Sequence, residues 1–91
     1  MVAPETRPQQ LDRFLGKDLE DEYVFYDAAG EQVHVLNSTA RKIYLLCDGS
    51  HSVQEIARVL VAEYEIDEST AREDAVQTIQ RLEALGLVSL S

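Results

Sequence analysis

The sequence predicts an α+β fold in which a three-stranded antiparallel sheet precedes three helices, similar to a winged helix-turn-helix with its sheet moved to the front. Two short runs rich in aromatic and β-branched residues flank a turn, and three later stretches repeat apolar residues at helical spacing. The 91 residues suffice for a single core. We expect a flexible N-terminal tail over residues 1–10, which are mostly polar and carry two prolines, and one domain over residues 11–91.

The sheet is predicted from the first part of this domain. Residues 11–19 form an irregular first strand with a bend or bulge at Gly16. The segments "EYVFY" (22–26) and "EQVHVL" (31–36) form a hairpin around "DAAG", in which Gly30 suits a positive φ. In such a meander the first and third strands are the edges of the sheet.

The first two helices are predicted from their caps and their apolar spacing. Asn37 or Ser38 caps the first helix, and Gly49 ends it. Ser52 and Glu55 have the spacing of a capping box and begin the second helix. The apolar faces of these two helices comprise Ala40, Ile43, Tyr44, Cys47, Val53, Ile56, Ala57, Leu60, Val61 and Tyr64.

The third helix is expected to begin between Asp67 and Thr70 and to run to about Leu85, with Gly86 as its stop. Thr70 and Glu73 fit a second capping box. The stripe that this helix would bury consists of Ala71, Ala75, Ile79, Leu82 and Leu85.

The charge of the chain argues against two classes of partner. Seventeen acidic residues against eight lysines and arginines leave a net charge of −9. Nucleic-acid binding draws its affinity from cations that neutralise phosphates, and an anionic membrane surface would repel this domain. We therefore expect no nucleic acid and no membrane as a partner. The N-terminus does not resemble a signal peptide, and the single cysteine suits a reducing compartment, so a cytoplasmic location is predicted.

The residues that could carry chemistry do not combine into a site. His34 alternates with two valines in a strand, and Cys47 falls on the apolar face of a helix. His51 lies in a loop beside Asp48 and two serines, but adjacency supplies neither an oriented base nor an oxyanion hole. Two histidines and one cysteine at unrelated spacings make no zinc site, and the sequence has no glycine-rich phosphate loop. The sequence thus predicts no catalytic residue, no metal and no cofactor.

The predicted third strand is an unprotected sheet edge. The first strand carries charges that blunt an edge, including Lys17 and Asp18, whereas residues 32–36 contain no proline and no lysine. Such an edge is either covered within the protein or available to an incoming strand. In strand addition, main-chain hydrogen bonds give affinity and pockets for alternate side chains give specificity.

The third helix offers a second wall for such a site. Ala71, Ala75 and Thr78 are small, and they flank Ile79 and Leu82, which would leave a shallow groove. Simple packing into the core accounts for the same stripe, and periodicity does not separate the two interpretations.

Several short motifs follow one another from residue 36 to residue 87: Leu36-Asn37-x-Thr39-Ala40, Cys47-Asp48-Gly49, Val53-x-Glu55-Ile56, Asp74 and Gly86-Leu87. In this order and at these distances they resemble the PqqD-like proteins, the RiPP recognition elements that bind leader peptides in pathways of ribosomally made, modified peptides. The resemblance extends over about residues 11–90. Most of these motifs are caps and stops, so they identify the fold better than the ligand.

The resemblance implies a non-catalytic domain that captures a precursor's leader peptide as a fourth strand. The leader would pair antiparallel to the third strand and lie against the third helix. It further implies a separate modifying enzyme as a partner, often a radical-SAM enzyme, or a leader protease or cyclase in lasso-type pathways. The peptide-binding residues implied in this way are Gln32, Val33, His34, Val35, Leu36, Ala71, Asp74, Ala75, Thr78, Ile79 and Leu82.

Two rival functions remain. A winged-helix DNA-binding regulator would need a basic third helix, but Arg72 and Arg81 are its only cations, beside four acidic residues. A scaffold domain that binds only its partner enzyme is compatible with everything in the sequence.

Overall fold

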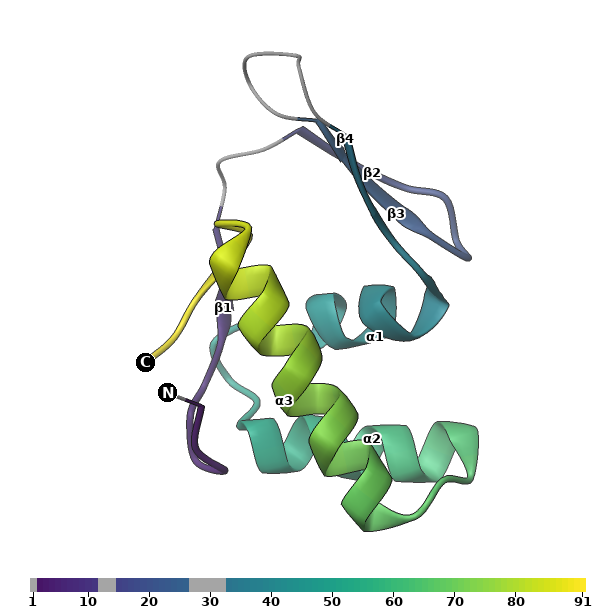
Figure 1. Ribbon diagram of the computed structural model, residues 1–91, viewed down its shortest axis with the longest axis vertical. Coiled ribbons are helices and arrows are strands. Elements are labelled where there is room, and N and C mark those ends of the chain that lie inside the picture. The colour runs from purple at the N-terminus through teal and green to yellow at the C-terminus, as the bar shows by residue number, and fades with distance from the viewer. Residues whose placement is uncertain (1, 12–14, 27–32) are drawn as a thin grey trace.

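The computed structural model describes residues 2–11, 15–26 and 33–91 (Figure 1). Strands β2, β3 and β4 form a three-stranded antiparallel sheet ahead of three helices, which confirms the predicted α+β fold. The predicted turn at Gly30 lies outside the described residues, as does Gln32. The elements are β1 (Gln9–Gln10), β2 (Leu15–Asp18), β3 (Tyr23–Tyr26), β4 (Val33–Leu36), α1 (Ser38–Leu46), α2 (Val53–Tyr64), α3 (Glu68–Ala84) and β5 (Val88–Ser89).

The sheet and the helices occupy opposite ends of an elongated molecule of 38 × 27 × 18 Å. Figure 1 shows the three-stranded sheet at one end and α2 at the other, with α1 between them and α3 crossing α2. Helix α1 packs against both β4 and α3, so it joins the sheet to the helical layer. One apolar core runs through these elements; its fully buried large side chains include Leu36, Ile43, Ile56, Leu60, Ile79, Leu82 and Leu87.

The predicted bulge at Gly16 is wrong. Strand β2 pairs with β3 without an extra residue, and Gly16 stands opposite Phe25. Glycine is needed there for another reason: a Cβ at this position would lie 2.5 Å from Cε1 of Tyr23. The missing side chain therefore makes room for an aromatic ring beneath the sheet.

All three predicted helix starts are confirmed, since α3 begins at Glu68, between Asp67 and Thr70. The Asn37 side chain accepts a hydrogen bond from the Ala40 N–H at 2.9 Å, and Ser52 and Glu55 form the reciprocal capping box of α2. The capping box predicted at Thr70 is wrong. Asp67 caps α3, and its Oδ1 accepts from the Thr70 N–H at 3.1 Å. Aspartate is among the strongest N-caps, and it precedes the threonine by less than one turn.

The helix ends agree less closely with prediction. Gly86, with φ of 78°, follows the last residues of α3 as expected. Helix α1 ends at Leu46, before the predicted stop at Gly49, and Gly49 takes its positive φ of 82° in the loop that follows. Tyr64, predicted on the buried face of α2, is 39% exposed at the end of that helix.

The N-terminal segment differs from the flexible tail that the sequence predicted for residues 1–10. Strand β1 pairs antiparallel with β5 at the end of the chain. The carbonyl of Thr6 accepts from the Val53 N–H at 2.8 Å, and Pro8 is fully buried. Backbone hydrogen bonds hold this segment in place. The pattern of side chains along the sequence does not reveal such bonds, so the sequence predicted a flexible tail instead.

Candidate peptide-binding site

Strand β4 is an edge of the sheet. The strand order is β2-β3-β4, and in the part of the chain that the structure describes β4 has one strand neighbour, β3. Val33, Val35 and Leu36 stand opposite Tyr26, Val24 and Tyr23 of β3. In an antiparallel pair, alternate residues turn their N–H and C=O groups away from the neighbour. The outer side of β4 therefore presents a row of main-chain groups to an additional strand.

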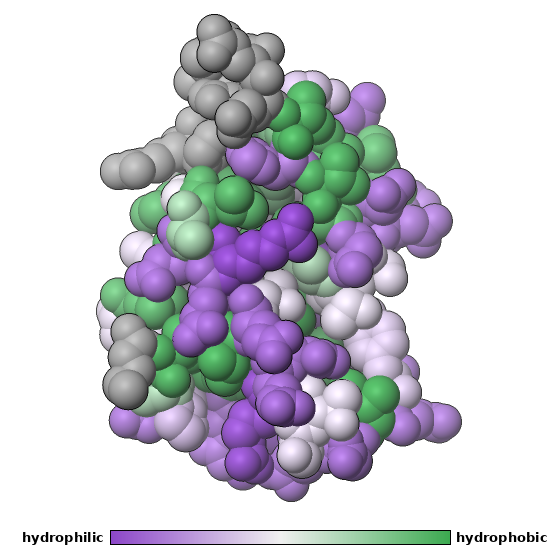
Figure 2. Space-filling model, in the orientation of Figure 1, coloured by the Kyte–Doolittle hydropathy of each residue, from purple (hydrophilic) through white to green (hydrophobic). Residues whose placement is uncertain are grey.

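The side chains of β4 divide between two faces. Leu36 is fully buried and His34 is half-buried, whereas Val33 and Val35 are 57% and 44% exposed. Residues two apart in a strand share a face, so His34 and Leu36 point toward the helices and the two valines point away. Figure 2 shows hydrophobic surface at the end of the molecule where Figure 1 places the sheet.

Helix α3 has a buried stripe and a partly exposed flank. Ala71, Ala75, Ile79 and Leu82 are all 0% exposed, as packing into the core requires. Asp74 and Thr78, one turn apart on the same side of the helix, are half-buried. Among the predicted site residues on α3, a ligand on the surface can therefore touch Asp74 and Thr78.

An aromatic cluster seats the sheet on α1. The rings of Tyr23 and Phe25 stack with centroids 4.7 Å apart, and the ring of Tyr44 meets Phe25 edge-on at 4.9 Å. Arg41 of α1 also binds the Asp18 carboxylate of β2 through two hydrogen bonds. The sheet is thereby fixed to the helix that follows β4, which holds the β4 edge in place without any contact from a ligand.

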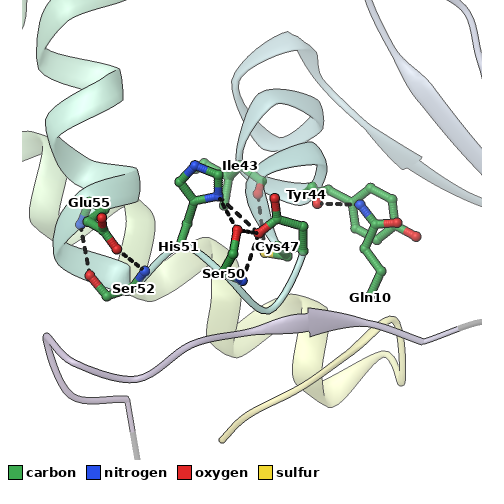
Figure 3. A network of polar contacts seen from close by, with 9 residues as sticks. Gln10, Ile43, Tyr44, Cys47, Ser50, His51, Ser52 and Glu55 are labelled. Atoms are coloured by element: carbon green, nitrogen blue, oxygen red, sulfur yellow. Dashed lines mark hydrogen bonds and ion pairs between the residues drawn. The ribbon is translucent and has the colours of Figure 1, made fainter.

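The polar loop after α1 has no catalytic geometry. His51 Nδ1 lies 2.9 Å from Oδ1 of Asp48, and the Ser50 hydroxyl is 2.8 Å from that same oxygen and 3.4 Å from that same nitrogen (Figure 3). A nucleophilic serine must instead contact the ring nitrogen opposite the aspartate. The hydrogen bond with His51, joined by bonds from Ser50, holds the pKa of Asp48 well below its usual range. These contacts stabilise the loop.

Cys47 is equally unsuited to nucleophilic chemistry. Its side chain is fully buried, and Sγ donates to the Ile43 carbonyl at 3.2 Å. Burial, with a smaller contribution from the Asp48 charge, raises the pKa of this thiol to about 12. Thiolate is the reactive form, so the sulfur is inert at neutral pH. Among the described residues no group of three His, Cys, Asp or Glu is placed to hold a metal ion.

A cavity that the sequence did not indicate lies at the opposite edge of the sheet. It has a volume of about 440 Å³ and separates β2 from the N-terminal segment. The N-terminal segment forms one wall of this cavity, and the sequence did not predict where that segment lies. Its walls are formed by Gln9, Gln10, Leu11, Leu15, Gly16, Tyr23, Phe25 and Tyr44.

No helix in the described ranges is long and apolar enough to span a membrane.

A family profile described as coenzyme PQQ synthesis protein D (PqqD) matches residues 22–88. The chain belongs to the PqqD family. The match includes β3, β4 and all three helices of the PqqD domain described above, whereas β2 lies outside it. The predicted resemblance is therefore confirmed, on the part of the chain that forms the candidate site. Among curated protein sequences, none matches the chain significantly.

Two solved structures share this PqqD fold. One is described as TbiB1 in complex with the TbiA(beta) leader peptide; it is 22% identical, the match covers 89% of this chain and 94% of that one, and the TM-score is 0.76. The other is described as lasso peptide synthetase B1 complexed with the leader peptide; it is 23% identical over 91% of this chain and 98% of that one, with a TM-score of 0.77.

Proposed function

We propose that this chain is a non-catalytic recognition module that binds the leader peptide of a ribosomally made precursor by adding it as a strand to β4. The observation that carries the proposal is the open edge of β4, which has no proline or lysine and exposes Val33 and Val35. Membership of the PqqD family supports it, and so do two structural neighbours whose descriptions name a bound leader peptide.

The proposed site has two parts with different roles. The backbone of β4, residues 33–36, supplies hydrogen bonds, and the partly exposed flank of α3 with Asp74 and Thr78 supplies side-chain contacts. The buried stripe of Ala71, Ala75, Ile79 and Leu82 supports this flank from below. The four residues therefore act on peptide binding through the position of α3, without touching the peptide.

We further propose that a separate enzyme modifies the captured precursor, as a radical-SAM enzyme, a leader protease or a cyclase would. The reactive side chains of this chain support that division of labour. The Cys47 thiol is buried, and Ser50 and Asp48 share one nitrogen of His51. The module would raise the local concentration of precursor at the enzyme, an effect that requires no chemistry of its own.

The proposal is tested by adding the N-terminal half of a candidate precursor peptide to the ¹⁵N-labelled domain. Amide shifts are expected at residues 32–36 and along the Asp74–Thr78 flank of α3. Hydrogen exchange gives the sharper readout. In the free domain alternate amides of β4 are protected by β3, and on binding the intervening amides become protected as well. Shifts without new protection in β4 would contradict strand addition, and no shifts at all would favour a scaffold that binds only its enzyme.

A proline substitution provides the mutational test. The backbone N–H groups of His34 and Val35 point to opposite sides of β4, so one of the two residues has its N–H at the open edge. Hydrogen exchange in the free domain identifies this residue, because its amide exchanges rapidly. Replacing that residue with proline removes a donor from the new ladder and should abolish binding. Threonine at the same position is the matched control, because it keeps the N–H and, as a β-branched residue, suits a strand. A folded proline variant with full affinity would refute the proposal.

A further inference from the structure

The outer face of the three-stranded sheet carries an exposed apolar row. Leu15, Tyr26 and Val33 stand opposite one another on successive strands, with exposures of 75%, 45% and 57%. Val35, 44% exposed, belongs to the next row of the same face, opposite Val24. Both rows end at the edge strand, where Val33 and Val35 have a described strand neighbour on one side.

Exposed valines on an open edge strand require an explanation. Natural sheets commonly place charges at such positions, because an apolar edge promotes unwanted pairing. The opposite edge of this sheet follows that practice in part, since β2 carries Lys17 and Asp18 beside the exposed Leu15. Residues that stand directly opposite one another in neighbouring strands are in contact. The exposed valines of β4 would therefore favour an added strand that has apolar residues opposite them.

We propose that Val33 and Val35 are specificity-determining residues, which select leader peptides that carry β-branched or aromatic side chains at two outward positions, i and i+2, of the added strand. This inference rests on the proposed strand addition at β4. A fourth strand would place alternate side chains on each face of the sheet. One set would face Leu36 and the Asp74–Thr78 flank of α3, and the other would extend the apolar row on the outer face.

The consequence is a two-sided recognition rule. A leader whose inward residues fit but whose outward residues are charged or glycine binds more weakly, by up to about fivefold for each lost cross-strand pair. A charge placed on β4 itself should change the preferred residue opposite it, because opposite charges in directly facing positions attract and like charges repel. This second effect changes the identity of the selected peptide, which a general loss of stability does not.

The test selects peptides from a displayed library of random linear dodecamers on the immobilised full chain, on Val35→Lys and on Tyr64→Lys. Tyr64, 39% exposed at the end of α2, is the matched control, because it is an exposed apolar residue away from the sheet. Wild type and Tyr64→Lys are expected to enrich peptides with β-branched or aromatic residues at i and i+2. Val35→Lys is expected to replace one of them with Asp or Glu, and a selected acidic peptide should bind Val35→Lys up to about fivefold more tightly than wild type.

The remaining outcomes separate this inference from the function on which it rests. Selected peptides that protect the β4 amides but show the same outward residues for wild type and Val35→Lys would overturn the role of the two valines and leave strand addition intact. Selected peptides that leave the β4 amides unprotected would overturn both. Self-association of the free chain that Val35→Lys abolishes would assign the outer face to a second copy and overturn the specificity role.

Discussion

Arg41 of α1 and Asp18 of β2 form a bidentate ion pair, with Nε 2.6 Å from Oδ1 and Nη2 2.8 Å from Oδ2. Strands β3 and β4 lie between the two residues in the chain, because β2 is the far edge strand of the sheet and α1 follows β4 directly. The pair therefore closes the whole meander onto the helix. Parallel hydrogen bonds of this kind fix orientation as well as distance.

Arg41→Ala should loosen the sheet without unfolding the helices. The measurement is amide hydrogen exchange, which should become faster in β2 and β3. Lys42→Ala is the matched control, because it removes an ion pair of the neighbouring residue, whose Nζ lies 2.8 Å from Oε1 of Glu63 on α2. Equal effects of the two substitutions on β2 would contradict the role assigned to Arg41.

The same pair predicts a dependence of stability on pH. The hydrogen bond from Arg41, with a further one from the Glu20 backbone, lowers the pKa of Asp18 below its usual value. A carboxyl whose pKa is lower in the folded state stabilises the fold above the unfolded pKa, about 3.9, and loses that contribution as the pH falls through the folded value. The difference in unfolding free energy between wild type and Asp18→Asn should be present at pH 7 and shrink below about pH 4. A difference that stays constant down to pH 2 would contradict this assignment.

The sequence predicted the elements whose signals are local. Periodicity identified the buried stripe of α3, and the cap at Asn37 and the stop at Gly86 follow from the chemistry of those residues. It did not predict the pair between Asp18 and Arg41, since 23 residues separate them and exposed charges have many possible partners. It also missed the course of the N-terminal segment, which main-chain hydrogen bonds determine.

The candidate site was predictable to the same extent. The open edge of β4 follows from strand order and from the lack of charge. Which α3 residues reach the surface does not follow, because the rotation of a helix about its axis depends on what packs around it. Ala75 and Thr78 both fitted the predicted groove, but only Thr78 has exposed surface.

This division on α3 predicts opposite effects of two neighbouring substitutions. Ile79→Ala should lower the free energy of unfolding by about 2–5 kcal/mol, because it leaves a cavity in the core. The folded fraction of that variant should bind the leader peptide with nearly unchanged affinity. Thr78→Ala should change stability little and weaken binding. Urea denaturation and titration of both variants give the comparison, and weaker binding by folded Ile79→Ala alone would place Ile79 in contact with the peptide.

The thiol of Cys47 should be protected as long as the domain is folded. With its pKa raised to about 12 by burial, almost no thiolate exists at pH 8, and the sulfur has no exposed surface. The labelling rate with a disulfide reagent should therefore be slow in buffer and rise with urea in parallel with global unfolding. The urea-unfolded chain provides the reference rate. Rapid labelling in buffer would show that the end of α1 opens locally.

Gly49 should tolerate no side chain, for two separable reasons. Its φ of 82° is unfavourable for other residues, and a Cβ there would collide with Oε1 of Gln9, which lies beside it in the N-terminal segment. Gly49→Ala is therefore expected to lower the free energy of unfolding by about 1–3 kcal/mol from the backbone alone, with the collision adding to it. Adding Gly49→Ala to the Gln9→Ala variant introduces the unfavourable φ without the collision. The loss of unfolding free energy measured against Gln9→Ala should therefore be smaller than the loss that Gly49→Ala causes in wild type. Wild-type stability of Gly49→Ala would contradict the positive φ at this position, and equal losses with and without the Gln9 side chain would show that this side chain moves aside without cost.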